Sequence, residues 1–394
     1  MAFPNINIEV GNGALGLTVP TNDALAGMVL QGPAPSGLAL GVPQLITSLV
    51  DAENLGIDAN YDSANTLGAH KAIREFYAGA GNGAQLWIMV VSQAVDMETI
   101  MDVAEQDYAV KLLNAAAGGI RLLTVVRNPA AAYTPTLADG IDSDVAAAIT
   151  NAQALATQYV SEYKPLRIIL PAYAYNNTPG DLPNLRTRSD NRVAVLLGDS
   201  VSGINAGVGI LLGRLADIPV QRNIGRVKSG SLPIVDGYIG TSTVESIGAA
   251  VEIISEKGFV TLRRHIGLAG YYFADDPTAT SATDDYNSIA RGRVIDKVIY
   301  IAYVTYLNEL LDEIDIDPVT GQIRTAQAKY YQAIAESAIN TAMTANEEIS
   351  GVEVEVDPNQ NVLSTGKLCV KLRVTPVGYA RVIEVDLGFI NNAL

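Results

Sequence analysis

The sequence predicts a mixed α/β chain in which a three-layer α/β domain precedes a smaller domain of long helices and antiparallel strands. Between residues 86 and 275, helical patterns alternate with short apolar runs, which is typical of a mainly parallel sheet covered by helices. After residue 275 this alternation stops, and two long helical patterns and three alternating strand patterns follow. We therefore expect a change of architecture near residue 275.

Composition excludes several classes of protein. The 394 residues include 26 basic and 42 acidic side chains, which give a net charge of −16 and a pI near 4.5. So acidic a surface repels phosphate backbones, and nucleic-acid binding is not expected. The single cysteine, Cys369, excludes an intramolecular disulfide, and two histidines are too few for a Cys/His zinc cluster. We expect neither a cofactor nor a metal ion.

The first 70 residues contain neither an export signal nor a continuous membrane span. The first basic residue is Lys71, so the positively charged region of a signal peptide is missing. Residues 24–50 form an uncharged run of 27 residues, but four glycines and three prolines interrupt any helix there. We expect short buried strands and turns in this run, synthesis in the cytoplasm without a signal peptide, and no insertion into a membrane.

The chain begins with a strand pattern. Ile6, Ile8 and Val10 alternate with polar residues, and the loose Gly11-Asn12-Gly13 follows. An isolated terminal strand must pair, either within its own sheet or with the edge of a neighbour's sheet. The expected helices that follow cover residues 44–55, 69–77, 99–116, 144–162, 204–215 and 244–256, and the expected strands cover residues 86–91, 120–126, 166–170, 193–197 and 259–262.

The C-terminal patterns are longer. Residues 288–314 predict a helix that is apolar nearly all round and therefore largely buried, and a turn at 317–321 separates it from a second helix at 325–345. Two strands follow, and the outward residues are acidic on the first and basic on the second, which favours an antiparallel pair with cross-strand ion pairs. These outward residues are Glu353 and Glu355 on the first strand and Lys367, Lys371 and Arg373 on the second. A third strand, 379–389, would place Ile383, Val385, Leu387 and Phe389 on one face.

The strongest enzymatic motif is the strand 193–197 followed by Gly198-Asp199-Ser200, which is similar to the nucleophile block of GDS-type esterases. That chemistry needs a histidine to activate the serine and an aspartate to orient it, usually as Asp-x-x-His. The position three residues before each histidine, His70 and His265, is a leucine. The structural interpretation is that Asp199 or Ser200 caps the next helix. An α/β hydrolase-type enzyme with Ser200 as nucleophile stays the alternative function.

Two further patterns have structural interpretations. The glycines at 79, 81 and 83 follow a helix and precede a strand, which is the reverse of the order in a dinucleotide-binding loop. The acidic clusters at 275–276, 284–285 and 312–317 lack the spacing of a calcium-binding loop. A flexible turn and solvated loops explain these residues.

The order of the patterns resembles that of contractile tail sheath proteins. The resemblance rests on residues 45–53, 72–81, 259–263, 270–276 and 286–294. It covers most of the chain, including both terminal strands, and is a match of order and pattern. Phe76-Tyr77 replaces the commoner aromatic pair of that family, and the turn at 317–321 replaces the usual end of the long helix. The chain looks most like the short sheaths of phage tails, tailocins and extracellular injection systems.

This resemblance implies a structural subunit and no enzymatic activity. Sheath subunits stack as hexameric rings around an inner tail tube, and the sheath contracts to drive the tube through a target envelope. The implied partners are further copies of the chain, the inner tube protein, and baseplate and terminator or cap proteins. Terminal strands complete a sheet in neighbouring subunits, and this role falls here on Ile6, Ile8, Val10, Ile383, Val385 and Leu387.

The resemblance also divides the chain. Residues 1–23 and 275–394 would form the inner domain, and residues 24–274 the outer domain. Gly11 and Gly13 would supply the hinge that lets the N-terminal strand change direction. A charged helix of the inner domain touches the tube in that family, which assigns the contact to Arg324 and Lys329. These two cations lie in a domain with 18 acidic and nine basic residues.

Overall fold

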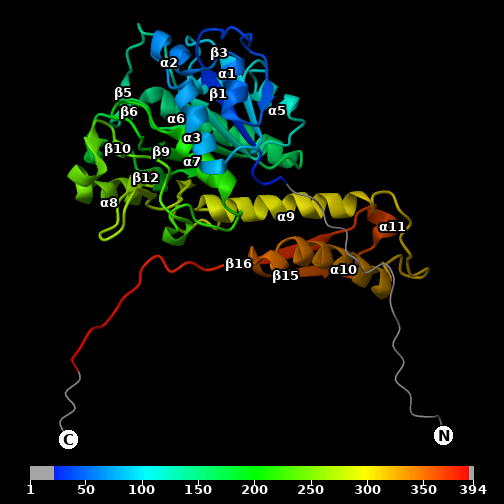
Figure 1. Cartoon of the computed structure of the whole chain (residues 1–394). Coiled ribbons are helices and arrows are strands. Elements are labelled where there is room, and N and C mark those ends of the chain that lie inside the picture. Colours follow the sequence, from blue (N-terminus) through cyan, green and yellow to red (C-terminus); the bar gives the residue numbers. More distant parts are fainter. Residues whose placement is uncertain (1–21, 390–394) are drawn as a thin grey trace, which may run out of the picture.

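The computed structural model describes residues 22–389, and its larger part is built on one eight-stranded sheet (Figure 1). The strand order is β13-β12-β9-β7-β4-β1-β3-β2. The strands are β1 (Ala26–Gln31), β2 (Gln44–Ile46), β3 (Leu86–Val91), β4 (Leu122–Val126), β7 (Arg167–Pro171), β9 (Val193–Leu197), β12 (Val260–Arg263) and β13 (Tyr272–Phe273). The central strands are parallel, and the two edge strands β2 and β13 are antiparallel to their neighbours. The predicted mixed α/β fold is confirmed.

Every residue of β4, β7 and β9 is buried, which indicates that helices cover both faces of this sheet. The helices are α1 (Leu49–Asn54), α2 (Ala59–Asn65), α3 (Ala69–Ala80), α4 (Met97–Met101), α5 (Ala109–Ala115), α6 (Ser143–Ser161), α7 (Val208–Asp217) and α8 (Gly248–Glu256). Helices α3 and α7 approach closely because Gly209 and Gly213 leave no side chain between α7 and the α3 backbone. Three short antiparallel pairs form separate two-stranded sheets: β5 (Leu137–Ala138) with β6 (Ile141–Asp142), β8 (Ser189–Asp190) with β14 (Ala279–Thr280), and β10 (Tyr238–Ile239) with β11 (Ser242–Thr243).

Several predicted helices have different boundaries in the structure: for example, the helix expected at 204–215 is α7, and the α-helix expected at 244–256 begins at Gly248. The helix expected at 44–55 begins only at Leu49, because Ser48 and Asp51 form a capping box there, while Gln44–Ile46 pair with β3. The helix expected at 99–116 is two helices, α4 and α5. Asp102 ends α4 because its backbone is extended and its carboxylate accepts the Ala104 N–H at 2.9 Å.

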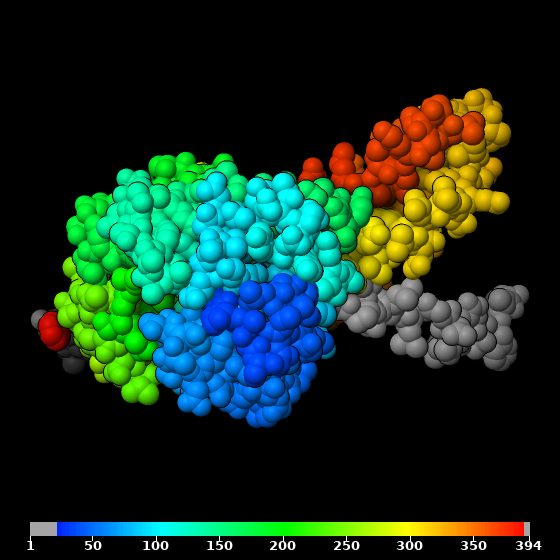
Figure 2. All heavy atoms as spheres, turned by 90° about the horizontal axis from the view of Figure 1, so that it is seen from above, coloured from blue at the N-terminus to red at the C-terminus, as the bar shows by residue number. Residues whose placement is uncertain are grey.

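The C-terminal part consists of a long helix, a second helix and a two-stranded sheet. Figure 1 shows α9 lying along the sheet domain, with the other elements packed on its far side. The elements are α9 (Ile289–Leu307), α10 (Thr325–Ala342), β15 (Ile349–Val356), α11 (Val362–Thr365) and β16 (Val370–Pro376). Figure 2 shows this part projecting from the rounded body of the sheet domain.

The predicted antiparallel pair is confirmed. Glu353 lies opposite Arg373 and Glu355 lies opposite Lys371, so each outward acid of β15 faces a base of β16. Lys371 Nζ is 3.4 Å from Glu355 Oε2. The opposite charges of the two outward faces therefore meet across the antiparallel pair, as the pattern predicts.

Helix α9 is less uniformly buried than its composition predicts. It ends at Leu307, which is 48% exposed, and residues 302–306 are only partly buried. Three charged residues of its N-terminal half are buried, namely Arg293, Asp296 and Lys297. These charges connect α9 to its surroundings, since Asp296 pairs with Arg167 of β7 while Lys297 Nζ donates to Glu348 Oε1 at 2.9 Å.

Candidate assembly interface

The two-stranded sheet of β15 and β16, called here the open sheet, has two edges without a strand partner among residues 22–389. Unpaired edge N–H and C=O groups are a template for pairing with another chain. Helix α10 packs on one face of the open sheet, and Gln332 Nε2 donates to the Val354 carbonyl at 3.1 Å. A pair of strands is only marginally stable by itself, so this sheet gains from further strands.

The C-terminal extension, residues 377–389, follows β16 and has no helix or strand. The third strand that the sequence predicts at 379–389 is therefore not formed within the described residues, where residues 377–389 pair with neither edge of the open sheet. Figure 1 shows the extension running away from the open sheet. Ile383, Val385 and Leu387 are 78%, 70% and 89% exposed, and Phe389 is fully exposed. Within residues 22–389, these apolar side chains are therefore not part of any hydrophobic core.

The other predicted exchange residues, Ile6, Ile8 and Val10, lie outside the described residues, as do the predicted hinge residues Gly11 and Gly13. Their roles stay predictions.

The two predicted tube-contact residues lie at the N-terminus of α10, and both are exposed. Arg324 is the N-cap residue, and its Nε is 3.1 Å from Asp315 Oδ1. The fold thus places an acidic loop beside a segment that has no acid of its own. The sequence identified the acidic cluster at 312–317 but not its contact with Arg324, because that contact depends on how the chain folds back at the turn. The acids of the loop are Glu309, Asp312, Glu313, Asp315 and Asp317.

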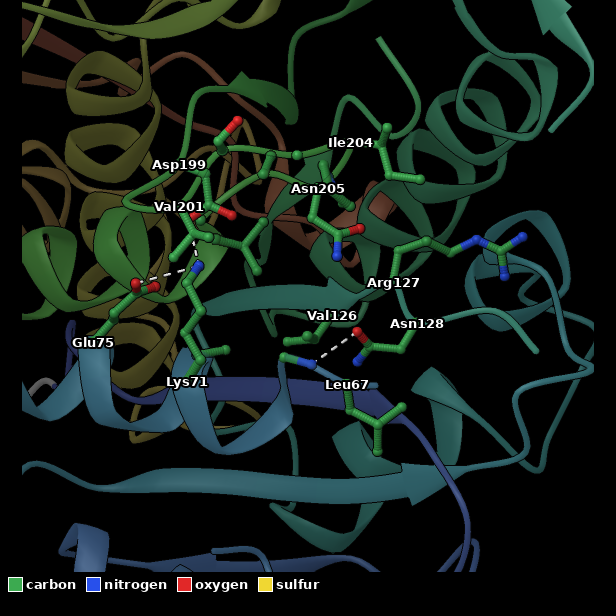
Figure 3. Close-up of a pocket in the computed structure, with 18 residues that line it drawn as sticks. Leu67, Lys71, Glu75, Val126, Arg127, Asn128, Asp199, Val201, Ile204 and Asn205 are labelled. Atoms are coloured by element: carbon green, nitrogen blue, oxygen red, sulfur yellow. Dashed lines mark hydrogen bonds and ion pairs between the residues drawn. The ribbon is translucent and has the colours of Figure 1, made fainter. Parts of the chain in front are cut away.

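A second feature is a polar crevice of about 170 Å³, shown in Figure 3, at the carboxyl ends of β4, β7 and β9. The Lys71 ammonium reaches both Asp199 and Glu75, which is 3.3 Å away. Burial lowers the pKa of Lys71, but the two carboxylates outweigh burial and raise the pKa overall. The expected helix cap at Asp199 or Ser200 is wrong, since α7 begins at Val208.

The crevice gives no support to a hydrolase with Ser200 as nucleophile. The Ser200 hydroxyl donates to Glu75 Oε1, and burial raises the pKa of Glu75. His70 Nε2 is instead 3.2 Å from Glu53, and the His265 ring packs edge-on against Tyr272. Activation of a serine needs an adjacent base that is itself oriented, and neither histidine contacts Ser200. The Lys71 cluster instead fastens α3 to the end of β9.

Residues 22–389 lack two other kinds of feature. Within this range no group of three or more His, Cys, Asp or Glu side chains is arranged to hold a metal ion. The helices of this range are too short or too polar to cross a lipid bilayer.

Comparisons with known proteins agree with this architecture. The sequence matches the N-terminal domain of the family described as DUF2586 over residues 3–277, and its C-terminal domain over residues 285–394. A comparison with curated protein sequences gave no match.

Three solved structures illustrate the likeness of the fold. The helical sheath of the anti-feeding prophage (AFP) in its contracted state has a TM-score of 0.62 and 14% identity, and the match covers 98% of this chain and 99% of that chain. The sheath complex of PVC, an extracellular contractile injection system, also in its contracted state, has a TM-score of 0.62 and 11% identity, with 98% of each chain covered. The sheath tail protein from Desulfitobacterium hafniense has a TM-score of 0.52 and 11% identity, with 95% and 100% covered. The chain therefore belongs to the DUF2586 family and has the fold of contractile sheath proteins.

Proposed function

We propose that this chain is the structural subunit of a contractile sheath in a phage tail or phage-tail-like particle. Copies stack as hexameric rings around an inner tube, between a baseplate and a terminator or cap protein, and the sheath shortens to drive the tube through a target envelope. The shared fold with the AFP and PVC sheaths supports this function. A six-fold symmetrised AFP baseplate structure also contains a chain with this fold, at a TM-score of 0.62 and 15% identity.

The observation that carries the proposal is the open sheet together with the C-terminal extension. Over residues 22–389, the chain presents strand edges without partners and also an alternating apolar segment that belongs to no sheet. Addition of an extended segment to an exposed sheet edge is a common mode of association. A contact between two different surfaces of identical chains repeats without closing and generates a helical array.

A single exchanged strand is weak, which suits an array that must rearrange. Burial of the four apolar side chains at 383, 385, 387 and 389 contributes about 1.5–3 kcal/mol each, or about 6–12 kcal/mol together. Ordering the backbone of residues 383–389 costs about 1–2 kcal/mol per residue, or about 7–14 kcal/mol. Main-chain hydrogen bonds add about 0.5–1.5 kcal/mol each. The balance for one strand is therefore close to zero, and many linked strands hold the array through avidity.

We further propose that residues 1–23 and 275–394 form the inner domain, which bears most lattice contacts, and that residues 24–274 form the outer domain. The separate hydrophobic clusters of the C-terminal part support this division, since residues of α9, α10 and β15 pack together there. The family matches also divide between residues 277 and 285. Gly11 and Gly13 are the proposed hinge of the N-terminal strand.

Truncation tests the proposed assembly. Chains that lack residues 1–10 or residues 382–394 should fold as soluble subunits and build no tubes in electron micrographs, because these segments supply ladders between subunits. Replacement of the exposed Ile266 and Val235 by serine serves as the control, since both lie on loops of the outer part. Tubes of normal length from either truncated chain would contradict the exchange. Tubes that never change length under any trigger would indicate an inert tube subunit.

Arg324 and Lys329 are the proposed contact with the inner tube. Such exposed ion pairs contribute about 0–1 kcal/mol each and are screened by salt, which suits a contact that must be released during contraction. Reversal of both charges to glutamate should reduce the yield of extended sheath–tube particles at moderate salt. The matched control reverses Arg226 and Lys228, two exposed cations of the outer part. An equal yield from both double variants would remove Arg324 and Lys329 from the contact.

A further inference from the structure

The C-terminal extension touches the sheet domain at two residues near its start. The Tyr379 hydroxyl donates to the Gln221 carbonyl, and Tyr379 is partly buried. Arg381 Nη2 is 3.5 Å from Asp275 Oδ2 and 3.7 Å from Asp276 Oδ1. From residue 382 to residue 389 every side chain is exposed. The start of the extension therefore contacts the sheet domain through Tyr379 and Arg381, whereas residues 382–389 are exposed.

The two carboxylates that pair with Arg381 are themselves held in place by hydrogen bonds. Asn223 Nδ2 donates to Asp275 Oδ1 at 2.7 Å and to Asp276 Oδ1 at 2.6 Å, so the amide fixes both side chains. Asp276 is completely buried. Its Oδ2 accepts the Ala290 N–H at 2.9 Å, and its carbonyl accepts the Ile289 N–H at 2.8 Å. Asp276 thus holds the first turn of α9, where the sheet domain and the C-terminal part meet.

We infer that Tyr379 and Arg381 anchor the C-terminal extension at this junction, so that the extension leaves every subunit from one fixed point and swings only from residue 382 onward. The inference rests on the proposed function, because it concerns how the exchanged strand finds its neighbour. Arg381 is the outer member of the pair, since its side chain is 47% exposed whereas that of Asp276 is 1% exposed. An ion pair of this kind holds a segment in place and still releases it.

The anchor sets the reach of the strand. From Arg381 to residue 389 the described extension has eight further residues, which span at most about 26–29 Å when fully extended. Without the anchor the free segment would start at residue 377, and its 13 residues up to residue 389 would span at most about 43–47 Å. A shorter free segment with a fixed origin samples fewer positions, so its effective concentration at one neighbouring sheet edge is higher.

Distance measurements between two spin labels test the anchor in the full-length subunit, below the concentration at which it assembles. One label is attached at Glu384→Cys and the other at Ala154→Cys, which is exposed on α6, in a Cys369→Ser background. The unmodified anchor and Arg381→Lys should give a narrow distance distribution. Arg381→Glu, which repels both carboxylates, should broaden it at least twofold, and Tyr379→Phe should broaden it less. The control is Lys228→Glu, which reverses an exposed charge of the outer part.

The same variants separate the anchor from the proposed function. If the unmodified chain builds tubes, Arg381→Glu should raise the critical concentration for assembly at least threefold while Arg381→Lys leaves it unchanged. An unchanged distribution width in Arg381→Glu overturns the anchor, whether or not tubes form. A broadened distribution with an unchanged critical concentration overturns its role in assembly. If the unmodified chain builds no tubes, the proposed function fails while the distance measurement still decides on the anchor. Should Arg381→Glu not fold, Arg381→Gln replaces it with the same expected direction.

Discussion

Replacement of Asp296 by alanine should strongly destabilise the attachment of α9 to the sheet. The Asp296 carboxylate is buried and accepts three hydrogen bonds, from Arg167 Nε at 2.6 Å, from Arg167 Nη2 at 3.0 Å and from Arg192 Nη1 at 3.0 Å. The side chain of Arg167 is only 4% exposed. Asp296→Ala therefore leaves a buried guanidinium group without its counter-charge.

Removal of one partner from a buried ion pair costs about 3–5 kcal/mol, because the remaining charge is desolvated and uncompensated. We expect a loss of this size for Asp296→Ala. Asp296→Asn keeps the shape and part of the hydrogen bonding but removes the charge, so its loss should be smaller, about 1.5–3 kcal/mol. Against a typical free energy of unfolding of about 5–15 kcal/mol, either loss is easily measured.

The measurement is urea unfolding of the subunit, followed by a signal from the whole chain. Asp285→Ala removes an exposed carboxylate close to the start of α9 and should change the free energy of unfolding by less than about 0.5 kcal/mol. Amide hydrogen exchange should also show faster opening of α9 and α10 in Asp296→Ala. A loss below about 1 kcal/mol for Asp296→Ala would refute the reasoning, because it would mean that Arg167 is solvated in the native state.

Three further predictions concern other parts of the chain. Gly213→Ala would place a methyl group 2.6 Å from a carbonyl oxygen of α3, and the forced separation of α3 and α7 should cost about 1–3 kcal/mol in thermal or urea unfolding. Lys371→Glu should lower the free energy of unfolding by at most about 1 kcal/mol, since the pair with Glu355 is exposed. Addition of Glu355→Lys should restore the free energy of unfolding. A double variant no more stable than the single variant would argue against this pairing. The backbone N–H of Thr47 donates a hydrogen bond to Asp51 and lowers its pKa below the usual value of 3.8. This carboxylate therefore stabilises the fold above pH 3.8, and its contribution is lost as the pH falls further. Asp51→Ala should flatten this part of the curve of unfolding free energy against pH, and an unchanged slope would contradict the assignment.

The sequence determined the elements whose signals are local. Residues 86–91 and 193–197 form β3 and β9 with the predicted bounds, because an apolar run between polar turns favours a buried strand whatever surrounds it. The charges of β15 and β16 identified their pairing for the same reason, since residues directly opposite each other interact through a single register. The alternation of apolar and polar residues at 379–389 also predicts a strand with one apolar face to bury against a sheet.

The tertiary structure decided which distant groups meet. Asp296 and Arg167, Lys71 and Asp199, and the pairing of Arg381 with the acidic pair at 275–276 are separated by more than 100 residues in the sequence. No periodicity encodes such contacts, because they arise only when the sheet order and the packing of α9 bring the segments together. The same holds for the extension: its pattern specifies a strand, but strand formation depends on pairing with an edge, and within the described residues the extension pairs with neither free edge of the open sheet. Local patterns thus predict the type and approximate position of most helices and strands. The three-dimensional arrangement of these elements decides which charges are buried and which residues the extension contacts.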